Sequence, residues 1–340
     1  MRIAILGAGS LGTVIGAYIA EGGQDVELID VYEAHVQALN EKGAKIIGTT
    51  EMTAKVKAVT PEKMTGVYDL VLLLTKQLYN DSVLTNLLPF LHDSSVVCSL
   101  QNGIPESKIA EIVGCERVIA GAVEFGATFT EPGVSELTTE YNRFKQYAFQ
   151  IGELNGEKTA RIQKIQEVLA LVGGTHISEN LVGTKWSKLL INNAFSGLSA
   201  AMNTTYGGVL DNEISVRSAA HIIDETIKVG HANGITFAKM NDFDIASLEI
   251  READDIEQHI KTLRVIIEPA RLLKASMLQD LEKKRKTEID FINGVVPQLA
   301  KGIATPYNDL VVAIVKQAEQ EGSLPDFDTT VLALAELNNK

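Results

Sequence analysis

The sequence predicts two domains, an α/β domain with a doubly wound, mostly parallel sheet over residues 1–180 and an all-α domain over residues 181–340. The chain opens with a strand that runs directly into a glycine-rich turn and a small-residue helix. Apolar runs then alternate with helical segments, which is typical of a parallel sheet covered by helices on both faces. Beyond about residue 180, helical periodicity continues while strand signals almost cease.

The expected strands of the first domain are short apolar runs bounded by polar or turn residues, as strands buried on both faces usually are. They lie at 1–6, 25–29, 45–47, 54–59, 69–75, 95–100, 118–130, 134–138 and 147–152. Helices are expected between them at 13–20, 33–42, 81–91 and 157–172. The runs 45–47 and 54–59 are interpreted as part of a crossover, and the turn signal Glu131-Pro132-Gly133 as a link between two strands.

The second domain is expected to consist of helices at 181–202, 215–233, 255–263, 269–284, 288–302 and 306–320. An acidic stretch, Asp242–Glu257, lies among them, and its carboxylates follow no regular ligand spacing. We therefore interpret it as a solvated acidic face rather than as a metal or acid–base site.

Composition limits the possible partners and compartments. The chain has 340 residues, of which 45% are hydrophobic, enough to fill two cores, and its net charge of −13 argues against nucleic acid or an anionic membrane as a partner. The longest aliphatic run, 70–74, is too short to span a membrane, and the initial strand is not a signal peptide. Two cysteines, Cys98 and Cys115, fit a reducing cytoplasm, and the scattered histidines predict no metal site.

The run Gly7-Ala8-Gly9-Ser10-Leu11-Gly12 is a G-x-G-x-x-G sequence between a strand and a helix. In this context Gly7 permits the tight turn, Gly9 lets a pyrophosphate approach the backbone, and Gly12 lets the helix pack closely on the sheet. The helix N-terminus then offers N–H groups to the phosphates. These features predict a Rossmann-type dinucleotide site; the alternative is a tight strand-to-helix turn that binds no ligand.

Asp30 ends the next strand, where an acidic side chain can accept hydrogen bonds from a ribose 2′-hydroxyl. Its carboxylate would repel a 2′-phosphate, and residues 28–33 include neither arginine nor lysine. The sequence therefore favours NAD over NADP as the cofactor.

Polar residues that suit ketone reduction follow two later strands and a helix. Lys76 and Asn102 stand at the carboxyl ends of their strands, where ligands of such sheets bind. Lys185, Lys188 and Asn192 share one face of the helix that starts the second domain. We expect Lys185 to be solvated, whereas Lys188 precedes an apolar run that would partly bury its stem and suit it to donate a proton.

Several segments of the second half carry a resemblance to a known family. The segment Trp186-Ser187-Lys188-Leu189-Leu190-Ile191-Asn192 is similar to the catalytic helix of the ketopantoate reductase (2-dehydropantoate 2-reductase) family. The family's sequence pattern is also matched by three later segments. These are 276–280 (SMLQD), 285–294 (RKTEIDFING) and Thr305-Pro306-Tyr307-Asn308. Together with the glycine turn, these matches cover nearly the whole chain.

The resemblance implies a role for each matched residue. Lys188 would be the general acid for the carbinol oxygen, Asn102 would contact the nicotinamide ribose and the substrate, and Glu288 would balance the lysine charge and orient cofactor and substrate. The remaining assignments are Lys76 and Gly126 to the cofactor, and Asn192, Ser196 and Ser276 to the substrate. Without the resemblance, Ser276 is interpreted as a helix cap or a turn residue.

Several positions depart from the family pattern. The family usually uses NADP and has a basic residue where this chain has Asp30-Val31. Ser196 and Tyr206 stand where asparagine is common, and Leu273 where an amide is often found, so the pocket is more apolar. An apolar pocket discriminates weakly between substrates, so a branched or aromatic 2-oxo acid, reduced to the (R)-2-hydroxy acid, competes with ketopantoate.

The sequence thus predicts a cytoplasmic, NAD-linked reductase of a small 2-oxo acid, compatible with a homodimer. A dehydrogenase acting on 3-hydroxy acids or opines is an alternative, and so is a non-catalytic NAD-sensing regulator. Catalysis by Cys98 as a thiol nucleophile is disfavoured, because this residue lies within an apolar strand.

Overall fold

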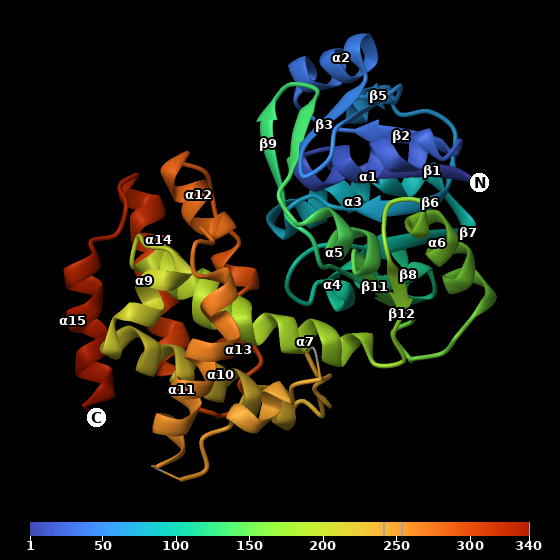
Figure 1. The fold of residues 1–340 in the computed structure, drawn as a ribbon. Coiled ribbons are helices and arrows are strands. Elements are labelled where there is room, and N and C mark those ends of the chain that lie inside the picture. Colours follow the sequence, from blue (N-terminus) through green and yellow to red (C-terminus); the bar gives the residue numbers. More distant parts are fainter. Residues whose placement is uncertain (241, 253, 340) are drawn as a thin grey trace. The chain divides into compact units, whose positions relative to one another are not determined.

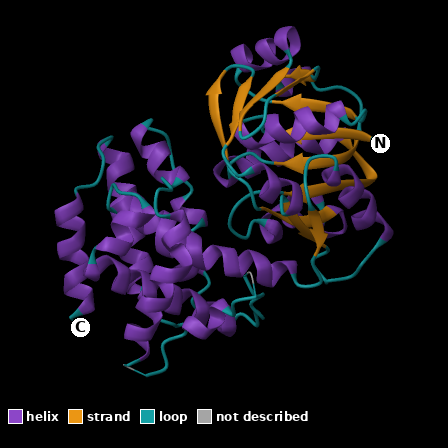
Figure 2. Cartoon of the chain, in the orientation of Figure 1, coloured by secondary structure: helices purple, strands orange, loops and turns teal. Residues whose placement is uncertain are grey.

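The computed structural model describes residues 1–240, 242–252 and 254–339. It divides into two compact units, Met1–Val182 and Gly183–Lys340, close to the expected boundary at residue 180. Figure 1 follows the chain through both units, and Figure 2 shows the strands gathered in the first unit and the helices that make up the second.

The first unit contains an eight-stranded sheet in the order β12-β11-β8-β7-β6-β1-β2-β5. The β8–β11 pair is antiparallel and the other neighbouring pairs run parallel, which confirms the predicted doubly wound, mostly parallel sheet. The strands are β1 (Arg2–Leu6), β2 (Asp25–Ile29), β5 (Lys57–Val59), β6 (Tyr68–Leu73), β7 (Leu91–Ser99), β8 (Val118–Val123), β11 (Phe149–Gly152) and β12 (Thr175–Ile177).

Both faces of this sheet are buried, as the apolar character of its strands predicts. Along β1, Ile3 and Ile5 belong to one hydrophobic core and Ala4 and Leu6 to the other. Residues of α1 and α6 fill the first core, whereas residues of α3 and α4 fill the second. These helices are α1 (Ser10–Glu21), α3 (Asn80–Leu87), α4 (Glu106–Val113) and α6 (Ala160–Ala170).

A second, four-stranded sheet in the order β4-β3-β10-β9 was not predicted. The expected strand 54–59 is wrong as a single unit, because β4 joins the small sheet and β5 the large one. The expected strand 118–130 is likewise two strands, β8 and β9. The predicted turn at Glu131-Pro132-Gly133 is confirmed, since it connects the antiparallel strands β9 and β10. The new bounds are β3 (Ala44–Gly48), β4 (Met52–Ala54), β9 (Ala127–Glu131) and β10 (Val134–Leu137).

The remaining differences in the first unit are small. The helix α2 (Glu33–Lys42) has the predicted bounds. The short helix α5 (Tyr141–Gln146) and the edge strand β12 were not predicted. The strand 147–152, expected to close the sheet, instead lies between β8 and β12.

The second unit is a helical array around α10 (Glu213–Ala232), which packs against α9, α11, α13, α14 and α15. The expected helix 181–202 is present, but a π-helical segment, η5 (Asn192–Gly197), separates α7 (Leu181–Ile191) from α8 (Leu198–Ala201). The other helices are α9 (Tyr206–Asp211), α11 (Asp255–Ile267), α12 (Ser276–Glu282), α13 (Val295–Gln298), α14 (Pro306–Glu321) and α15 (Phe327–Asn338).

Two expected helices of this unit are wrong in extent. Of 269–284 only α12 is α-helical, because the carbonyls of Arg271 and Leu273 instead accept hydrogen bonds from the N–H groups of Gly207 and Tyr206. The expected helix 288–302 reduces to a 3₁₀ turn, η8 (Ile289–Phe291), and the short α13. The sequence had not indicated α9 or α15.

Candidate functional site

The glycine-rich turn lies where ligands of doubly wound sheets bind. It follows β1, which stands between β2 and β6, the point at which the strand order reverses. Gly7 has φ of 100°, and a Cβ there would lie 2.7 Å from the Thr75 nitrogen, so β1 and β6 end side by side. A Cβ on Gly12 would lie 2.2 Å from the Gly7 carbonyl oxygen. Both glycines are therefore required for the turn to close.

Gly9 is different, because space beside it is open. Apart from Gly9 itself and the adjoining backbone, no heavy atom of the described residues lies within 4 Å of a Cβ built on Gly9. Gly9 is also the N-cap of α1, and it supplies no side-chain cap to the first turn, which in the described chain holds no acidic residue. The first N–H groups of a helix have no partner within the helix. An uncapped, open helix N-terminus fits a dinucleotide pyrophosphate.

Asp30 directly follows β2 and is half-buried. Its Oδ1 accepts a hydrogen bond of 3.0 Å from the backbone N–H of Tyr32, which is the N-cap of α2. Val31 and Tyr32 are exposed beside it. The structure thus fixes the carboxylate at the end of the strand that neighbours β1, where an adenosine ribose would be recognised.

The ends of β6 and β7 are joined by side-chain amides that the sequence analysis did not single out. Gln77 Nε2 donates to the Asn102 carbonyl at 2.6 Å, and Gln101 Nε2 donates to the Thr75 carbonyl at 2.6 Å. Gln101 also exchanges hydrogen bonds with Asn80. Only their position in the sequence could have indicated this role, because Gln77 adjoins Lys76 and Gln101 adjoins Asn102. The half-buried Lys76 and the exposed Asn102 are thereby carried on segments linked to each other.

Gly126 lies in the connection between β8 and β9. Its N–H donates to Thr139 Oγ1 at 2.8 Å, and its carbonyl accepts from the Thr138 N–H at 3.1 Å. These bonds hold the connection closed against the segment that follows β10.

In the second unit, Lys188, Asn192 and Ser196 follow one another at four-residue spacing and are all half-buried. Their neighbours Leu189 and Phe195 are fully buried. Asn192 and Ser196 both belong to the π-helical η5, a conformation found frequently at functional sites. The expectation that Lys185 is solvated is wrong, since only 4% of it is exposed.

Ser196 has a hydrogen-bonding partner at one of the positions where the sequence departs from the family. Its Oγ lies 2.6 Å from the hydroxyl of Tyr206, which is buried and packs against Phe195 with a ring separation of 5.5 Å. Burial raises the pKa of Tyr206, so this phenol stays protonated at neutral pH. Leu273 is 45% exposed.

Ser276 and Glu288 lie at the beginnings of short helical elements. Ser276 is exposed and is the first residue of α12, which packs against η5. Its N-cap is Ala275, so the interpretation of Ser276 as the capping residue is wrong. Glu288 is half-buried and precedes η8, which packs against α14.

A buried polar network that sequence reasoning missed supports η5. Asn293 Nδ2 donates to the Asn193 carbonyl at 3.1 Å and to Asn308 Oδ1 at 3.0 Å. Asn308 donates to Glu225 Oε2 through its side chain at 2.7 Å and its backbone at 3.0 Å, and the Tyr307 N–H donates to Oε1 at 2.8 Å. Burial raises the pKa of Glu225 to about 7 although these bonds oppose the shift.

The remaining features are accounted for by local structure. In the described stretches of 242–257, Asp244 caps a 3₁₀ turn, Asp255 accepts from two backbone N–H groups, and Glu257 pairs with Arg217, as a solvated acidic face would. Among the described residues, no three or more potential metal ligands are grouped together. Cys98 is buried in β7.

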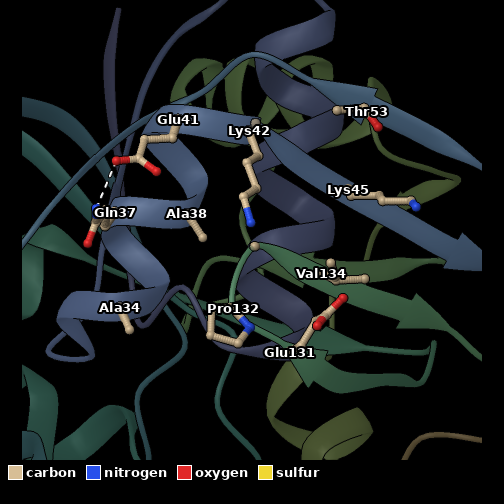
Figure 3. Close-up of a pocket in the computed structure, with 12 residues that line it drawn as sticks. Ala34, Gln37, Ala38, Glu41, Lys42, Lys45, Thr53, Glu131, Pro132 and Val134 are labelled. Atoms are coloured by element: carbon tan, nitrogen blue, oxygen red, sulfur yellow. Dashed lines mark hydrogen bonds between the residues drawn. The ribbon is translucent and has the colours of Figure 1, made fainter.

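Within the described chain, no helix combines the length and the apolar character that crossing a bilayer requires. An open hollow of about 500 Å³ lies on the outside of the first unit, between α2, β3, β4 and the β9–β10 turn (Figure 3). Its lining carries both signs of charge, from Lys42, Lys45, Glu41 and Glu131. None of the residues that line it belongs to the glycine-rich turn, residues 7–12.

The fold, the glycine turn and the strand-end acid define a two-domain protein with a dinucleotide-binding first domain. Residues 3–155 match the family model for ketopantoate reductase PanE/ApbA, and residues 180–319 match the model for the C-terminal domain of the same family. The chain belongs to this family of NAD(P)-dependent oxidoreductases.

Individual relatives cover almost the whole chain. It is 34% identical to a 2-dehydropantoate 2-reductase of Pyrococcus horikoshii, over 95% of this chain and 99% of the relative. It is 28% identical to the enzyme of that name from Lactococcus lactis subsp. lactis, over 94% and 98%. Among solved structures, D-mandelate dehydrogenase with NADH and anilino(oxo)acetate has a TM-score of 0.81 at 27% identity, over 95% and 99%. A Geobacter metallireducens 2-dehydropantoate 2-reductase has a TM-score of 0.77 at 26% identity, over 94% and 100%.

Proposed function

We propose that the protein reduces the C2 ketone of ketopantoate or a related 2-oxo acid with NADH, and that Lys188 is the general acid. The observation that carries this proposal is the row of half-buried polar side chains, Lys188, Asn192 and Ser196, along a helical run whose other residues are mostly buried. Membership of the family supports the reaction class, and the matched catalytic helix supports the assignment of Lys188.

Each proposed role follows from the chemistry of a ketone becoming an alcohol. The nicotinamide supplies the hydride when it is bound. Lys188 donates a proton to the carbonyl oxygen as negative charge develops there. Asn192, Ser196 and Ser276 bind the substrate carboxylate or hydroxyl, and Glu288 balances the charge of the lysine. Asn102 contacts the nicotinamide ribose and the substrate, while Lys76 and Gly126 lie against the cofactor.

Preference for NADH is the second part of the proposal. It is supported by the Asp30 carboxylate at the end of β2 and by the exposed, uncharged Val31 and Tyr32 beside it. A 2′-phosphate at that place would meet a negative charge and no balancing cation from residues 28–33. Calorimetry with both cofactors tests this, and tighter binding of NADPH would contradict it.

The test of Lys188 is the pair of variants Lys188→Ala and Lys164→Ala, because Lys164 is an exposed lysine on α6. We expect Lys188→Ala to lower kcat by about a hundredfold or more while its dissociation constant for NADH stays the same, as for a positioned proton donor. Lys164→Ala should match the unaltered enzyme. Unchanged turnover in Lys188→Ala would remove this residue from the mechanism.

A branched or aromatic 2-oxo acid is a second candidate substrate, favoured by the hydrogen-bonded Ser196–Tyr206 pair. Two side chains that hydrogen-bond to each other, next to Phe195, leave an environment that is more apolar than one with free amides. The similarity to the solved structure of D-mandelate dehydrogenase with NADH and anilino(oxo)acetate also supports an aromatic substrate. We expect kcat/KM over a panel of hydroxymethyl, branched and aromatic 2-oxo acids to identify the preferred class. NADH binding without turnover of any of them would support a regulatory protein instead.

A further inference from the structure

His35 is a buried imidazole that none of the roles above uses. It lies in the first turn of α2, five residues after Asp30, and only 1% of it is exposed. Its Nε2 lies 2.7 Å from the carbonyl oxygen of Ala8, the residue between Gly7 and Gly9 of the glycine-rich turn. A histidine on the helix that follows the second strand thus reaches the turn that follows the first.

The hydrogen-bonding partners of His35 determine where its proton lies. The N–H of Gly133, in the β9–β10 turn, points to Nδ1 at 2.9 Å. Because a backbone N–H can only donate, Nδ1 accepts, and a neutral ring carries its proton on Nε2. Nε2 therefore donates to the Ala8 carbonyl, which also accepts from Thr13 Oγ1 at 2.7 Å. Burial lowers the pKa of His35, so the neutral form is the one present at neutral pH.

The orientation of the Ala8 carbonyl bears directly on phosphate binding. In a planar trans peptide the carbonyl oxygen and the next N–H point in opposite directions. Holding the Ala8 carbonyl against His35 and Thr13 therefore turns the Gly9 N–H the other way. Gly9 is the N-cap of α1, and the space beside it is open in the described structure.

The backbone of His35 is bonded to the segment that would recognise the ribose. The backbone N–H of His35 donates to the Tyr32 carbonyl at 2.9 Å, and the backbone N–H of Tyr32 donates to Asp30 Oδ1 at 3.0 Å. The backbone of residues 32–35 and these hydrogen bonds therefore connect the Asp30 carboxylate to the His35 ring, which in turn bonds to the Ala8 carbonyl. The Phe129 ring packs edge-on against His35 with a centroid separation of 5.0 Å and restricts its rotation.

We propose that His35 is a positioning residue for the dinucleotide, which holds the phosphate-binding turn at Ala8–Gly9 and the ribose-binding turn at Asp30–Tyr32 in a fixed relationship through its Nε2–H. This inference rests on the proposed function, because it assumes that the glycine turn binds NADH. It adds a residue from α2 to the cofactor site and gives the β9–β10 turn a part in its geometry.

Three substitutions separate the two hydrogen bonds of the ring. His35→Gln can keep a donor near the Nε2 position, His35→Asn can keep an acceptor near Nδ1, and His35→Phe keeps ring volume without either. The control is Gln37→Ala, two residues along the same helix, because Gln37 is exposed and bonds to Glu41 on the rim of the outer hollow (Figure 3). The measurements are the dissociation constant for NADH, kcat at saturating NADH, and the melting temperature of the full chain.

We expect His35→Phe and His35→Asn to raise the dissociation constant for NADH by about tenfold, the effect of losing one well-oriented hydrogen bond. Their kcat at saturating NADH should change by less than about twofold, while His35→Gln and Gln37→Ala should bind NADH nearly as the unaltered protein does. A purely structural role would instead lower the melting temperature in all three His35 variants and leave NADH binding unchanged, which would overturn the proposal.

The two proposals fail in different ways. If the unaltered protein bound neither NADH nor NADPH, the proposed function would fail and the inference with it. If the unaltered protein bound NADH but all three His35 variants bound it equally well, only the inference would fail. Weaker NADH binding by His35→Gln than by His35→Asn would also contradict the inference. It would mean that NADH binding depends on the bond from Gly133 to Nδ1 and not on the bond from Nε2 to Ala8.

Discussion

The side-chain amide of Gln77 donates a hydrogen bond of 2.6 Å to the main-chain carbonyl of Asn102. Gln77 follows β6 and Asn102 follows β7, so this bond fixes the backbone that carries a proposed substrate- and cofactor-binding side chain. Gln77 is buried and Asn102 exposed, as expected for a supporting residue and the residue it presents.

This relationship predicts the effect of removing the amide. Gln77→Leu keeps the volume but leaves the Asn102 carbonyl without this donor, and we expect kcat/KM to fall by about tenfold because Asn102 is less well positioned. Ser82→Ala, on the exposed face of α3, is the control. Steady-state kinetics check the prediction, and equal kcat/KM in both variants would show that the bond is dispensable.

The glycine-rich turn predicts opposite outcomes for two apparently similar substitutions. Gly12→Ala would drive a methyl group to 2.2 Å from the Gly7 carbonyl, which is backbone and cannot move aside, so we expect a large loss of stability. In Gly9→Ala the new methyl group meets no described atom beyond the adjoining backbone within 4 Å, so this variant should fold with a nearly unchanged melting temperature.

Gly9→Ala should nevertheless bind NADH at least about tenfold more weakly, because the new methyl group occupies space that a pyrophosphate needs. Thermal melting and NADH titration, performed on the same samples, separate the two effects. Normal NADH binding by Gly9→Ala would place the phosphates elsewhere.

Asp30 can be tested by separating its charge from its hydrogen bond. Asp30→Asn keeps an acceptor for the Tyr32 N–H, whereas Asp30→Ala removes it. We expect both variants to bind NADH at least about tenfold more weakly, since a hydrogen bond from the ribose to a charged acceptor is lost. In both variants the difference between the dissociation constants for NADH and NADPH should become smaller. Titration of each variant with the two cofactors checks this. An unchanged preference in both would show that Asp30 does not select the cofactor.

The buried Glu225 predicts that the second unit becomes less stable as pH rises. Burial raises its pKa from 4.5 to about 7 in the folded protein. The folded form therefore holds a proton that the unfolded form has already lost above about pH 4.5. The stabilising contribution is full below that pH and is lost as pH rises through 7, which amounts to about 2 kcal/mol between pH 5.5 and 8.

The single tryptophan makes this measurement specific, because Trp186 is buried in the second unit. Urea unfolding followed by Trp186 fluorescence should give a lower stability at pH 8 than at pH 5.5. Glu225→Gln cannot titrate and should show a smaller difference, although it is less stable overall because one accepting oxygen becomes an NH₂ group. The same pH dependence in both proteins would mean that another group is responsible.

The parts of the fold that local pattern determines were predictable from the sequence. β1, β2, α1 and α2 are continuous in sequence, and their apolar spacing and turn residues lie within a few positions of each other. The family resemblance, carried by short motifs such as residues 285–294, was likewise local and is confirmed by the family models.

The parts that depend on distant partners were not predictable in the same way. β3 pairs with β10, about ninety residues later in the chain, so nothing near Lys45 indicates a separate sheet. β12 is only three residues long and follows two glycines, which hide its strand pattern. The helix expected over 288–302 failed because the backbone at Ile292, with φ of −109° and ψ of −89°, leaves the helical conformation.

The candidate site shows the same division. The glycine turn and Asp30 lie in one continuous segment and could be identified directly. His35, Gln77, Gln101 and Glu225 act through hydrogen bonds to residues remote in sequence or to backbone carbonyls, which no spacing rule reveals. Lys185 was misjudged because helical spacing says which residues share a face but not what covers that face.

The π-helical turn between α7 and α8 also has a consequence for engineering this protein. An α-helix broken by such a turn is less stable than an uninterrupted one, and here Asn293 reaches across to support it. A deletion that restored regular winding could gain thermal tolerance, yet it would rotate Ser196 relative to Lys188. Selection for heat resistance alone would therefore tend to disrupt the row of polar side chains to which we assign substrate binding.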